Sequence, residues 1–368
     1  MTQTDGYVSV TRRMRCGPQR SWVTHACRCS SCTRARPAFP WTGRWVGLTL
    51  SVTGRSSSGR HGRIQEPSMT IAVTGANSSV GLNLLAHLAN REDLSVVAVV
   101  RSERAAGSLP SSLRSAPRIA SYEDVEQLTR VIAGASCVVH LAGVLVESKA
   151  STYKNANVDT TAAVVDASQR AGVQQIVLVS VIGASSDSPN RYLKSKGEAE
   201  RLVADSGISS TIIRTPILLG RGTAGAAGLV RVASQNKVRL LDGGRYTMRP
   251  LDLDDLSRAI LAAIRTQPEG VSIHELVGPE AVRYHDLVAR VAHMMGRDLS
   301  IGTMPLWIAR AGAAITSRIR GGGVSPTVID VITADEAVET NADIELGINL
   351  TPLSTTLEKI LSDSDRDR

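Results

Sequence analysis

Tyr192 and Lys196 stand four residues apart and are the pair in this sequence whose types and spacing best suit acid–base chemistry. Positions i and i+4 of a helix share one face, so a helix here would place the phenol beside the ammonium. A neighbouring positive charge lowers the pKa of a phenol, which would let Tyr192 give or take a proton at a substrate oxygen while a hydride moves. Two solvated side chains on an exposed helix are the alternative interpretation.

A second candidate site is the segment Thr74–Gly81, which reads T-G-A-N-S-S-V-G. A tight turn from a strand into a helix directs backbone N–H groups at the pyrophosphate of a dinucleotide. Gly75 permits such a turn and Gly81 permits close packing of helix on strand, while Ser78 adds bulk and also a hydroxyl that can donate to phosphate. We therefore predict a nicotinamide dinucleotide site that includes Gly75, Asn77, Ser78, Ser79, Val80 and Gly81.

Arg101 follows directly after the apolar run Leu94–Val100. An acid at this place accepts hydrogen bonds from the adenosine ribose hydroxyls of NAD, whereas an arginine suits the 2′-phosphate of NADP. The first acid after the run is Glu103. We therefore expect NADP(H) in preference to NAD(H), with an ordinary solvated arginine as the alternative.

Short apolar runs alternate with segments of helical periodicity from Met69 onward. The run Leu94–Val100 is almost continuously apolar, as expected of a parallel strand covered on both faces. This alternation predicts an α/β fold with a doubly wound parallel sheet of the Rossmann type. We expect strands at 70–73, 94–100, 119–120, 137–141, 175–180 and 211–214, and helices at 80–88, 123–133, 160–171 and 190–205.

The regular alternation of apolar runs and helical segments ends near Pro216, and glycines at 220–228 indicate a flexible loop. We assign residues 69–216 to an NAD(P)-binding domain and 217–361 to a small C-terminal substrate lobe interleaved with the last sheet elements. Residues 362–368 are expected to form a frayed, charged tail.

Three features of this chain have structural explanations. Asp252, Asp254 and Asp255 precede a predicted helix, where acids cap the first turn, so we do not expect them to bind metal. A helix over 305–319 is expected to turn its apolar face to the core, with docking on a membrane or a partner as the alternative. His140 and Cys137 lie in a core strand and are expected to pack rather than to ligate.

The motifs together resemble the short-chain dehydrogenase/reductase family, whose phosphate loop reads T-G-x-x-G-x-x-G and whose helix carries Y-x-x-x-K. Met69 to about Leu361 is similar to an atypical member of the extended branch. Arg214-Thr215-Pro216, Leu346-Gly347 and Thr351-Pro352-Leu353 resemble the group containing the NADPH-binding accessory subunit of respiratory complex I and its bacterial relatives.

This resemblance implies roles for particular residues. Lys196 would hold the nicotinamide ribose as well as tune Tyr192, and Asn157 matches the structural asparagine of the family. The catalytic hydroxyl of the family follows the fifth strand, where this chain has Ser180 at the strand end but Val181 and Ile182 at the aligned positions, with Ser185 as a substitute. A missing oxyanion donor typically costs about 2.7–4 kcal/mol. Further cofactor contacts are implied for Leu141, Ala142, Gly143 and Pro216.

Two functions follow from these expectations. The first is an NADP(H)-dependent oxidoreductase or epimerase that uses Tyr192 and Lys196 on a small-molecule substrate. The second is a non-catalytic NAD(P)H-binding accessory, sensor or assembly protein with a protein-complex partner, which Val181 and Ile182 favour. No apolar run approaches the roughly 20 residues of a membrane-spanning helix.

The charge of the chain is concentrated in residues 1–68, which hold eleven Arg, no Lys and two acids, a net of +9. The whole chain carries +8, so the rest sums to −1 and we expect no nucleic-acid partner. The segment is expected to be disordered or a mis-assigned extension, which implies a cytoplasmic protein. A transit peptide, and hence a mitochondrial matrix location, is one alternative. A zinc site at His25, Cys27, Cys29 and Cys32 is another.

Overall fold

The computed structural model describes residues 69–366 with gaps at 90, 111–115 and 321–322. The expectations for residues 1–68, including the zinc site and the transit peptide, lie outside the described residues. Among the helices that are described, none combines the length and the apolar character needed to cross a bilayer.

A seven-stranded, fully parallel sheet forms the centre of the fold. The order β3-β2-β1-β4-β5-β6 reverses direction between β1 and β4, as in a doubly wound dinucleotide-binding sheet. This confirms the predicted fold class. In spatial order the strands are β11 (Val271–Glu275), β6 (Ser209–Thr215), β5 (Gln175–Val181), β4 (Cys137–His140), β1 (Met69–Thr74), β2 (Leu94–Val100) and β3 (Arg118–Ile119).

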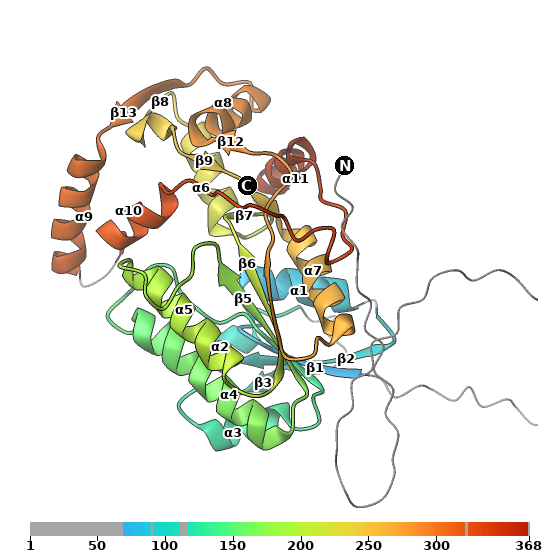
Figure 1. Cartoon of the computed structure of the whole chain (residues 1–368). Coiled ribbons are helices and arrows are strands. Elements are labelled where there is room, and N and C mark those ends of the chain that lie inside the picture. Colours follow the sequence, from blue (N-terminus) through green and yellow to red (C-terminus); the bar gives the residue numbers. More distant parts are fainter. Residues whose placement is uncertain (1–68, 90, 111–115, 321–322, 367–368) are drawn as a thin grey trace, which may run out of the picture. The chain divides into compact units, whose positions relative to one another are not determined.

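Helices cover both faces of this sheet (Figure 1). On one face α1 (Ser79–Ala89) and α7 (Leu253–Thr266) share an aliphatic core with the sheet. On the other face α3 (Val125–Ile132), α4 (Thr160–Ala171) and α5 (Arg191–Ala204) form two further clusters. The short helix α2 (Glu103–Ala106) follows β2. Both faces of the strands are therefore buried, which explains their nearly continuous apolar sequences.

A second hydrophobic cluster lies beyond the carboxyl edge of the sheet and is built by the C-terminal part of the chain. Its helices are α6 (Ala224–Ala233), α8 (Tyr284–Met294) and α11 (Leu353–Arg366). Short strand pairs frame it: β7 (Leu218–Leu219) with β10 (Leu251–Asp252), β9 (Thr247–Met248) with β12 (Val282–Arg283), and β8 (Lys237–Leu241) with β13 (Ser300–Met304). The remaining helices are α9 (Leu306–Arg320) and α10 (Pro326–Ile332).

Of the three acids near the start of α7, Asp252 caps the helix as predicted, and Asp254 and Asp255 lie within its first turn. Asp252 accepts a hydrogen bond from the amide of Asp254 at 2.9 Å and is the N-cap. Asp255 is fully buried and accepts from the amide of Thr351 at 2.7 Å. No cluster of potential metal ligands occurs in the part of the chain that the structure describes.

Helix α11 runs to Arg366, and Leu353, Leu357 and Ile360 bury one face of its first turns, ahead of the residues that we expect to fray. One expectation for the C-terminal part is wrong. Helix α9 does not turn its large apolar side chains to the core. Ile315 and Ile319 are 61% and 77% exposed, because the inward side of the helix is made of small residues.

Candidate cofactor and active site

Most of the predicted site residues lie at one edge of the sheet, because the carboxyl ends of parallel strands meet there. Gly75 follows β1, Arg101 follows β2 and Leu141 follows β4, while Ser180 is near the end of β5. The order of the strands reverses between β1 and β4. Open α/β sheets bind ligands in the crevice at such a reversal.

The glycine turn after β1 has no room for side chains at two positions. Gly75 has φ +71°, and a Cβ built on it would lie 2.8 Å from the backbone nitrogen of Ala142. A Cβ on Gly81 would lie 2.5 Å from the carbonyl oxygen of Ala76. Both distances are shorter than real Cβ contacts, so the tight strand–turn–helix geometry depends on these two glycines.

Ser78 is the residue that caps α1. Its hydroxyl accepts a hydrogen bond from the amide of Gly81 at 3.0 Å, and its carbonyl accepts from Leu82 at 2.8 Å. The first-turn amides of Ser79 and Val80 have no carbonyl acceptor within the helix. The turn therefore presents N–H groups and the positive end of a helix dipole, which is the donor set that a pyrophosphate requires.

Tyr122, which the sequence analysis did not select, lies beside this turn. Burial raises the pKa of Tyr122, while the hydroxyl of Thr74, the charge of Arg101 and the backbone of Gly75 act in the opposite direction. The phenol of Tyr122 thus lies where β1, β2 and β3 end, close to Thr74, Gly75 and Arg101. Its position directly after β3 is the only signal in the sequence that could have indicated it. The hydroxyl of the preceding residue, Ser121, accepts from the amide of Glu123 at 3.1 Å.

Asn157 connects the loop after β4 to the helix that carries Tyr192. Its amide oxygen accepts from the backbone of Val144 at 2.8 Å, and its amide nitrogen donates to Ser195 at 2.9 Å. A Cβ on Gly143 would lie 3.0 Å from that amide oxygen and 3.9 Å from the ammonium nitrogen of Lys196. Gly143 therefore occupies a narrow place between Asn157 and Lys196.

Tyr192 stands in the first turn of α5. The side chain of Asn190 caps this helix by accepting from the amides of Tyr192 and Leu193 at 3.0 and 3.2 Å. The ring of Tyr192 lies 5.6 Å from that of Tyr153, centroid to centroid. Its hydroxyl makes no hydrogen bond to any residue that the structure describes. Burial, with a smaller contribution from Tyr153, raises the pKa of Tyr192.

Lys196 points into the protein rather than toward solvent. Its ammonium donates to the carbonyl oxygen of Val179 at 3.0 Å. Burial lowers the pKa of Lys196 to about 8, against the opposing effect of Glu200. We expected the lysine to lower the pKa of Tyr192, but the structure raises the pKa of the phenol, because burial dominates and the ammonium is engaged by the strand.

The hydroxyl expected to complete the site is at Ser180, which is 4% exposed. By strand alternation it shares a face with Leu178, which packs against Val203 of α5. Its oxygen has no hydrogen-bond partner among the described residues.

The substitute, Ser185, lies in the loop after β5 and packs directly on α5. A Cβ on Gly197 would lie 2.2 Å from the backbone carbon of Ser185. The hydroxyl of Ser185 accepts from the amide of Asp187 at 3.3 Å. The loop therefore folds back onto the helix as required, but the serine hydroxyl forms a local turn.

His140 and Cys137 pack as expected. The ring of His140 lies between the hydroxyls of Thr74 and Thr161, at 2.7 and 3.1 Å. Burial, together with the charge of Lys196, lowers the pKa of His140 to about 3, so the ring is neutral at physiological pH. Burial raises the pKa of the Cys137 thiol to about 12.

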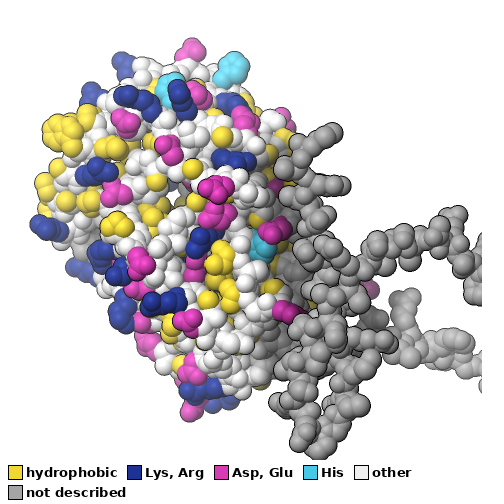
Figure 2. Space-filling view, viewed as in Figure 1, with side chains coloured by type: hydrophobic (Ala, Val, Ile, Leu, Met, Phe, Trp, Pro, Cys, Tyr) yellow, Lys and Arg dark blue, Asp and Glu magenta, His cyan; other side chains and the backbone are white. Residues whose placement is uncertain are grey.

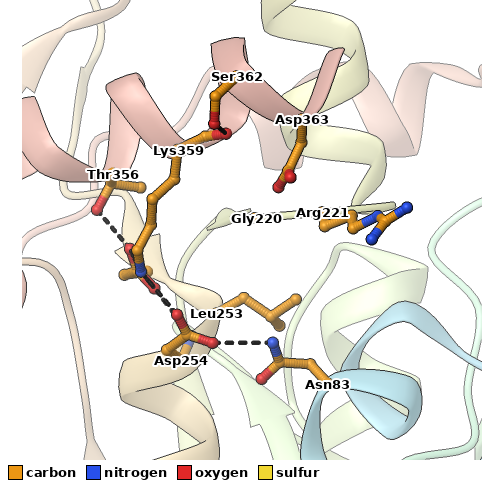
Figure 3. A pocket seen from close by; sticks show the side chains of 10 residues that line it. Asn83, Gly220, Arg221, Leu253, Asp254, Thr356, Lys359, Ser362 and Asp363 are labelled. Carbon is orange, nitrogen blue, oxygen red and sulfur yellow. Dashed lines mark hydrogen bonds and ion pairs between the residues drawn. The ribbon is translucent and has the colours of Figure 1, made fainter. Parts of the chain in front are cut away.

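A cavity also lies away from the predicted site. A cavity of about 380 Å³ opens between α1, α7 and α11 (Figure 3). Lys359 bridges Asp252 and Asp254 on its wall, at 2.9 and 2.7 Å, and Asn83 donates to Asp254 at 2.9 Å. In this network two carboxylates share the single ammonium of Lys359. In the glycine turn, by contrast, the amides of Ser79 and Val80 have no acceptor among the residues that the structure describes.

Sequence comparison identifies relatives of known class. The profile of the family described as NAD(P)H-binding matches residues 75–262. The chain is 26% identical over 313 residues to NADH dehydrogenase [ubiquinone] 1 alpha subcomplex subunit 9, mitochondrial, from Arabidopsis thaliana, covering 80% of this chain and 77% of that protein. It is 25% identical over 189 residues to a ceramide reductase from Caulobacter vibrioides, covering 51% of this chain and 59% of the reductase.

Structure comparison adds a solved relative of the same fold. MoeE5 in complex with UDP-glucuronic acid and NAD superposes with a TM-score of 0.65 at 20% identity, covering 81% of this chain and 100% of that one. At this identity the likeness shows the fold alone. It agrees with the Rossmann-type sheet described above.

Proposed function

The chain belongs to the NAD(P)H-binding family, and on this premise we propose that it is an NADP(H)-dependent oxidoreductase or epimerase in which Tyr192 transfers the proton. The observation that carries this proposal is the phenol hydroxyl of Tyr192, which has no protein partner within the described residues. A free hydroxyl on a capped helix, next to the loop after β4, is available to a substrate oxygen.

The residues of the glycine turn would hold the cofactor. The amides of Ser79 and Val80 would bind the pyrophosphate, and the crowding at Gly75 and Gly81 fixes the turn that aims them. Arg101 is exposed at the end of β2 and would pair with a 2′-phosphate, beside the phenol of Tyr122. The preference for NADP(H) over NAD(H) rests on Arg101.

Tyr192 is protonated at neutral pH, because the ordinary pKa of a phenol lies well above 7 and burial raises it further. When bound, the cofactor supplies a hydride. The phenol is suited to donate a proton to the oxygen of a carbonyl group that is being reduced. Lys196 is a positioning residue, because its bond to Val179 fixes α5 against β5.

The test is NADPH oxidation over a panel of aldehydes, ketones and quinones. We expect turnover with at least one member, and we expect Tyr192→Phe to abolish it while NADPH still binds with unchanged affinity. Tyr246→Phe is the matched control, because that tyrosine stacks on Tyr284 in the C-terminal cluster. Turnover that survives Tyr192→Phe would show that Tyr192 does not transfer the proton.

A non-catalytic NAD(P)H-binding accessory function is the second candidate. Val181 and Ile182 supply no hydroxyl at the end of β5, and the hydroxyl of Ser180 is buried. The name of the Arabidopsis relative, a subunit of a larger dehydrogenase, supports the same idea. NADPH that co-purifies and exchanges slowly, without turnover on any member of the panel, would favour this function over the first.

A further inference from the structure

Helix α9 presents a row of large apolar side chains to solvent. Ile308, Ile315 and Ile319 are 45%, 61% and 77% exposed, and their spacings of seven and four place them on one face of the helix. Trp307, at the start of the helix, is 71% exposed. Ala313, on the opposite side, is buried at 8%. A small residue, Ala313, thus faces the protein, and the three isoleucines face outward.

The apolar surface continues beyond α9. Val324, in the connection to α10, is 53% exposed, and Ile332 at the end of α10 is 39% exposed. Figure 2 shows hydrophobic side chains gathered at the edge of the molecule where Figure 1 places α9, with Lys and Arg beside them. We call this set, Trp307, Ile308, Ile315, Ile319 and Val324, the α9 patch.

The charged residues of helix α9 itself are all arginines. Helix α9 contains Arg310, Arg318 and Arg320 and no acid. Arg310 pairs with Asp330 of α10 at 2.7 Å. Arg318 is exposed and makes no ion pair within the described part of the chain. A complementary surface must therefore be apolar and anionic.

Two parts of this protein could cover the α9 patch, namely residues 1–68 and the same patch of a second copy, and both fit it poorly. Residues 1–68 carry a net charge of +9, so they repel rather than complement an arginine-edged face. A second copy would bring the same arginines against each other, since a two-fold interface pairs identical patches.

The dimensions of the patch also argue against a folded protein partner. A helix of 15 residues is about 22 Å long and about 10 Å wide, so its outer face covers roughly 220 Å². A stable protein–protein interface takes about 800 Å² from each partner. A lipid interface needs no complementary shape, and an amphipathic helix with tryptophan and arginine lies in the plane of such an interface.

We propose that α9 docks the protein on the surface of an anionic membrane. The isoleucines enter the boundary between headgroups and acyl chains, and Trp307 lies at headgroup level. Arg318 extends its aliphatic stem along the apolar face and places its guanidinium among lipid phosphates. This proposal is independent of the proposed enzymatic function.

The test measures binding of the full chain to sedimented vesicles. One set consists of phosphatidylcholine alone and the other contains one quarter phosphatidylglycerol. We expect the wild type to bind the anionic set. The double variant Ile315→Asp/Ile319→Asp should bind at least about tenfold more weakly, because the free energy gained when the two isoleucine side chains leave water is lost. Ile344→Asp is the matched control, because Ile344 is 88% exposed away from α9, and it should bind as the wild type does.

The basic N-terminal segment could bind anionic vesicles by itself, so a second readout isolates α9. The emission of Trp307, obtained as the difference between wild type and Trp307→Phe, should shift to the blue on anionic vesicles and be quenched by brominated lipid. Equal vesicle binding by the wild type and the double aspartate variant would overturn the proposal. A double variant that instead converts a dimer into a monomer would identify the patch as a self-interface.

Discussion

Lys196 donates a hydrogen bond from its ammonium to the carbonyl oxygen of Val179, 3.0 Å away, and this contact ties α5 to the end of the central strand β5. The ammonium is thus used to position the helix, and burial lowers the pKa of Lys196 to about 8. Tyr192, one turn earlier, has a hydroxyl with no hydrogen-bond partner among the described residues. The two residues share a helix face, as the spacing predicted, but the structure gives them different tasks.

The first prediction concerns the pH dependence of stability that arises from Lys196. Its pKa is about 8 in the folded chain against 10.5 ordinarily, so between these values the unfolded chain binds a proton that the folded chain does not. The free energy of unfolding contributed by this group therefore rises with pH in that window. Between pH 7.5 and 9.5 the rise is about 2 kcal/mol.

Urea unfolding of wild type and Lys196→Met at both pH values measures this contribution. From pH 7.5 to pH 9.5 the free energy of unfolding of wild type should rise by about 2 kcal/mol relative to that of Lys196→Met. Other groups that titrate in the same range, such as Cys137, cancel in the comparison. Lys194→Met, on the exposed side of the same helix, should show no such change. Parallel pH profiles for Lys196→Met and wild type would contradict the burial of a charged amine.

The second prediction concerns Tyr153, which supports Tyr192. Tyr153 is 3% exposed, its ring packs against that of Tyr192 at an interplanar angle of 54°, and its hydroxyl donates to the carbonyl of Leu145 at 2.9 Å. Tyr153→Ala should lower the free energy of unfolding by about 3 kcal/mol or more, because it opens a cavity. Tyr153→Phe keeps the ring and should cost about 1 kcal/mol for the lost hydrogen bond. Equal, small losses for both variants would show that the ring does not support the site.

The sheet was the part of this protein that its sequence predicted best. Continuous apolar runs such as Leu94–Val100 and Gln175–Ser180 become strands of the sheet because both faces are covered, and their short length and many valines favour a strand over a buried helix. The glycine turn was equally predictable, since its steric demands are local. The start of α5 was predicted to within one residue, at Asn190, which is the N-cap of that helix.

Features that depend on tertiary contacts were not predictable. The hydroxyl of Ser78 was expected to face phosphate, but it caps α1 because the amide of Gly81 lies 3.0 Å away. Tyr122 reaches the glycine turn only because β3 and β1 end at the same edge. The periodicity of α9 showed an apolar face but not whether another element covers it.

The third prediction concerns the C-terminal helix. Lys359 of α11 bridges Asp252 and Asp254 at the start of α7, and Asp252 is 3% exposed. Lys359→Met should lower the free energy of unfolding by about 1–3 kcal/mol, because a buried carboxylate loses its counter-charge. The control is Lys154→Met, whose ion pair with Asp159 is exposed and should contribute less than about 1 kcal/mol. Equal effects of the two substitutions would show that the bridge does not anchor α11.

The fourth prediction concerns cofactor selectivity and Arg101. Arg101→Ala should weaken NADPH binding by roughly 10- to 100-fold, the value of a charge-assisted hydrogen bond to phosphate, and leave NADH binding unchanged. Arg104→Ala, an exposed arginine three residues further along, is the matched control. A loss of affinity for both cofactors would assign Arg101 a structural role instead.

The most direct measurement is a titration of the wild-type protein with NADPH and with NADH, followed by nicotinamide fluorescence. The glycine turn, the cap at Ser78 and the arginine after β2 together predict that both cofactors bind and that NADPH binds more tightly. Binding of neither cofactor would contradict the assignment of the site.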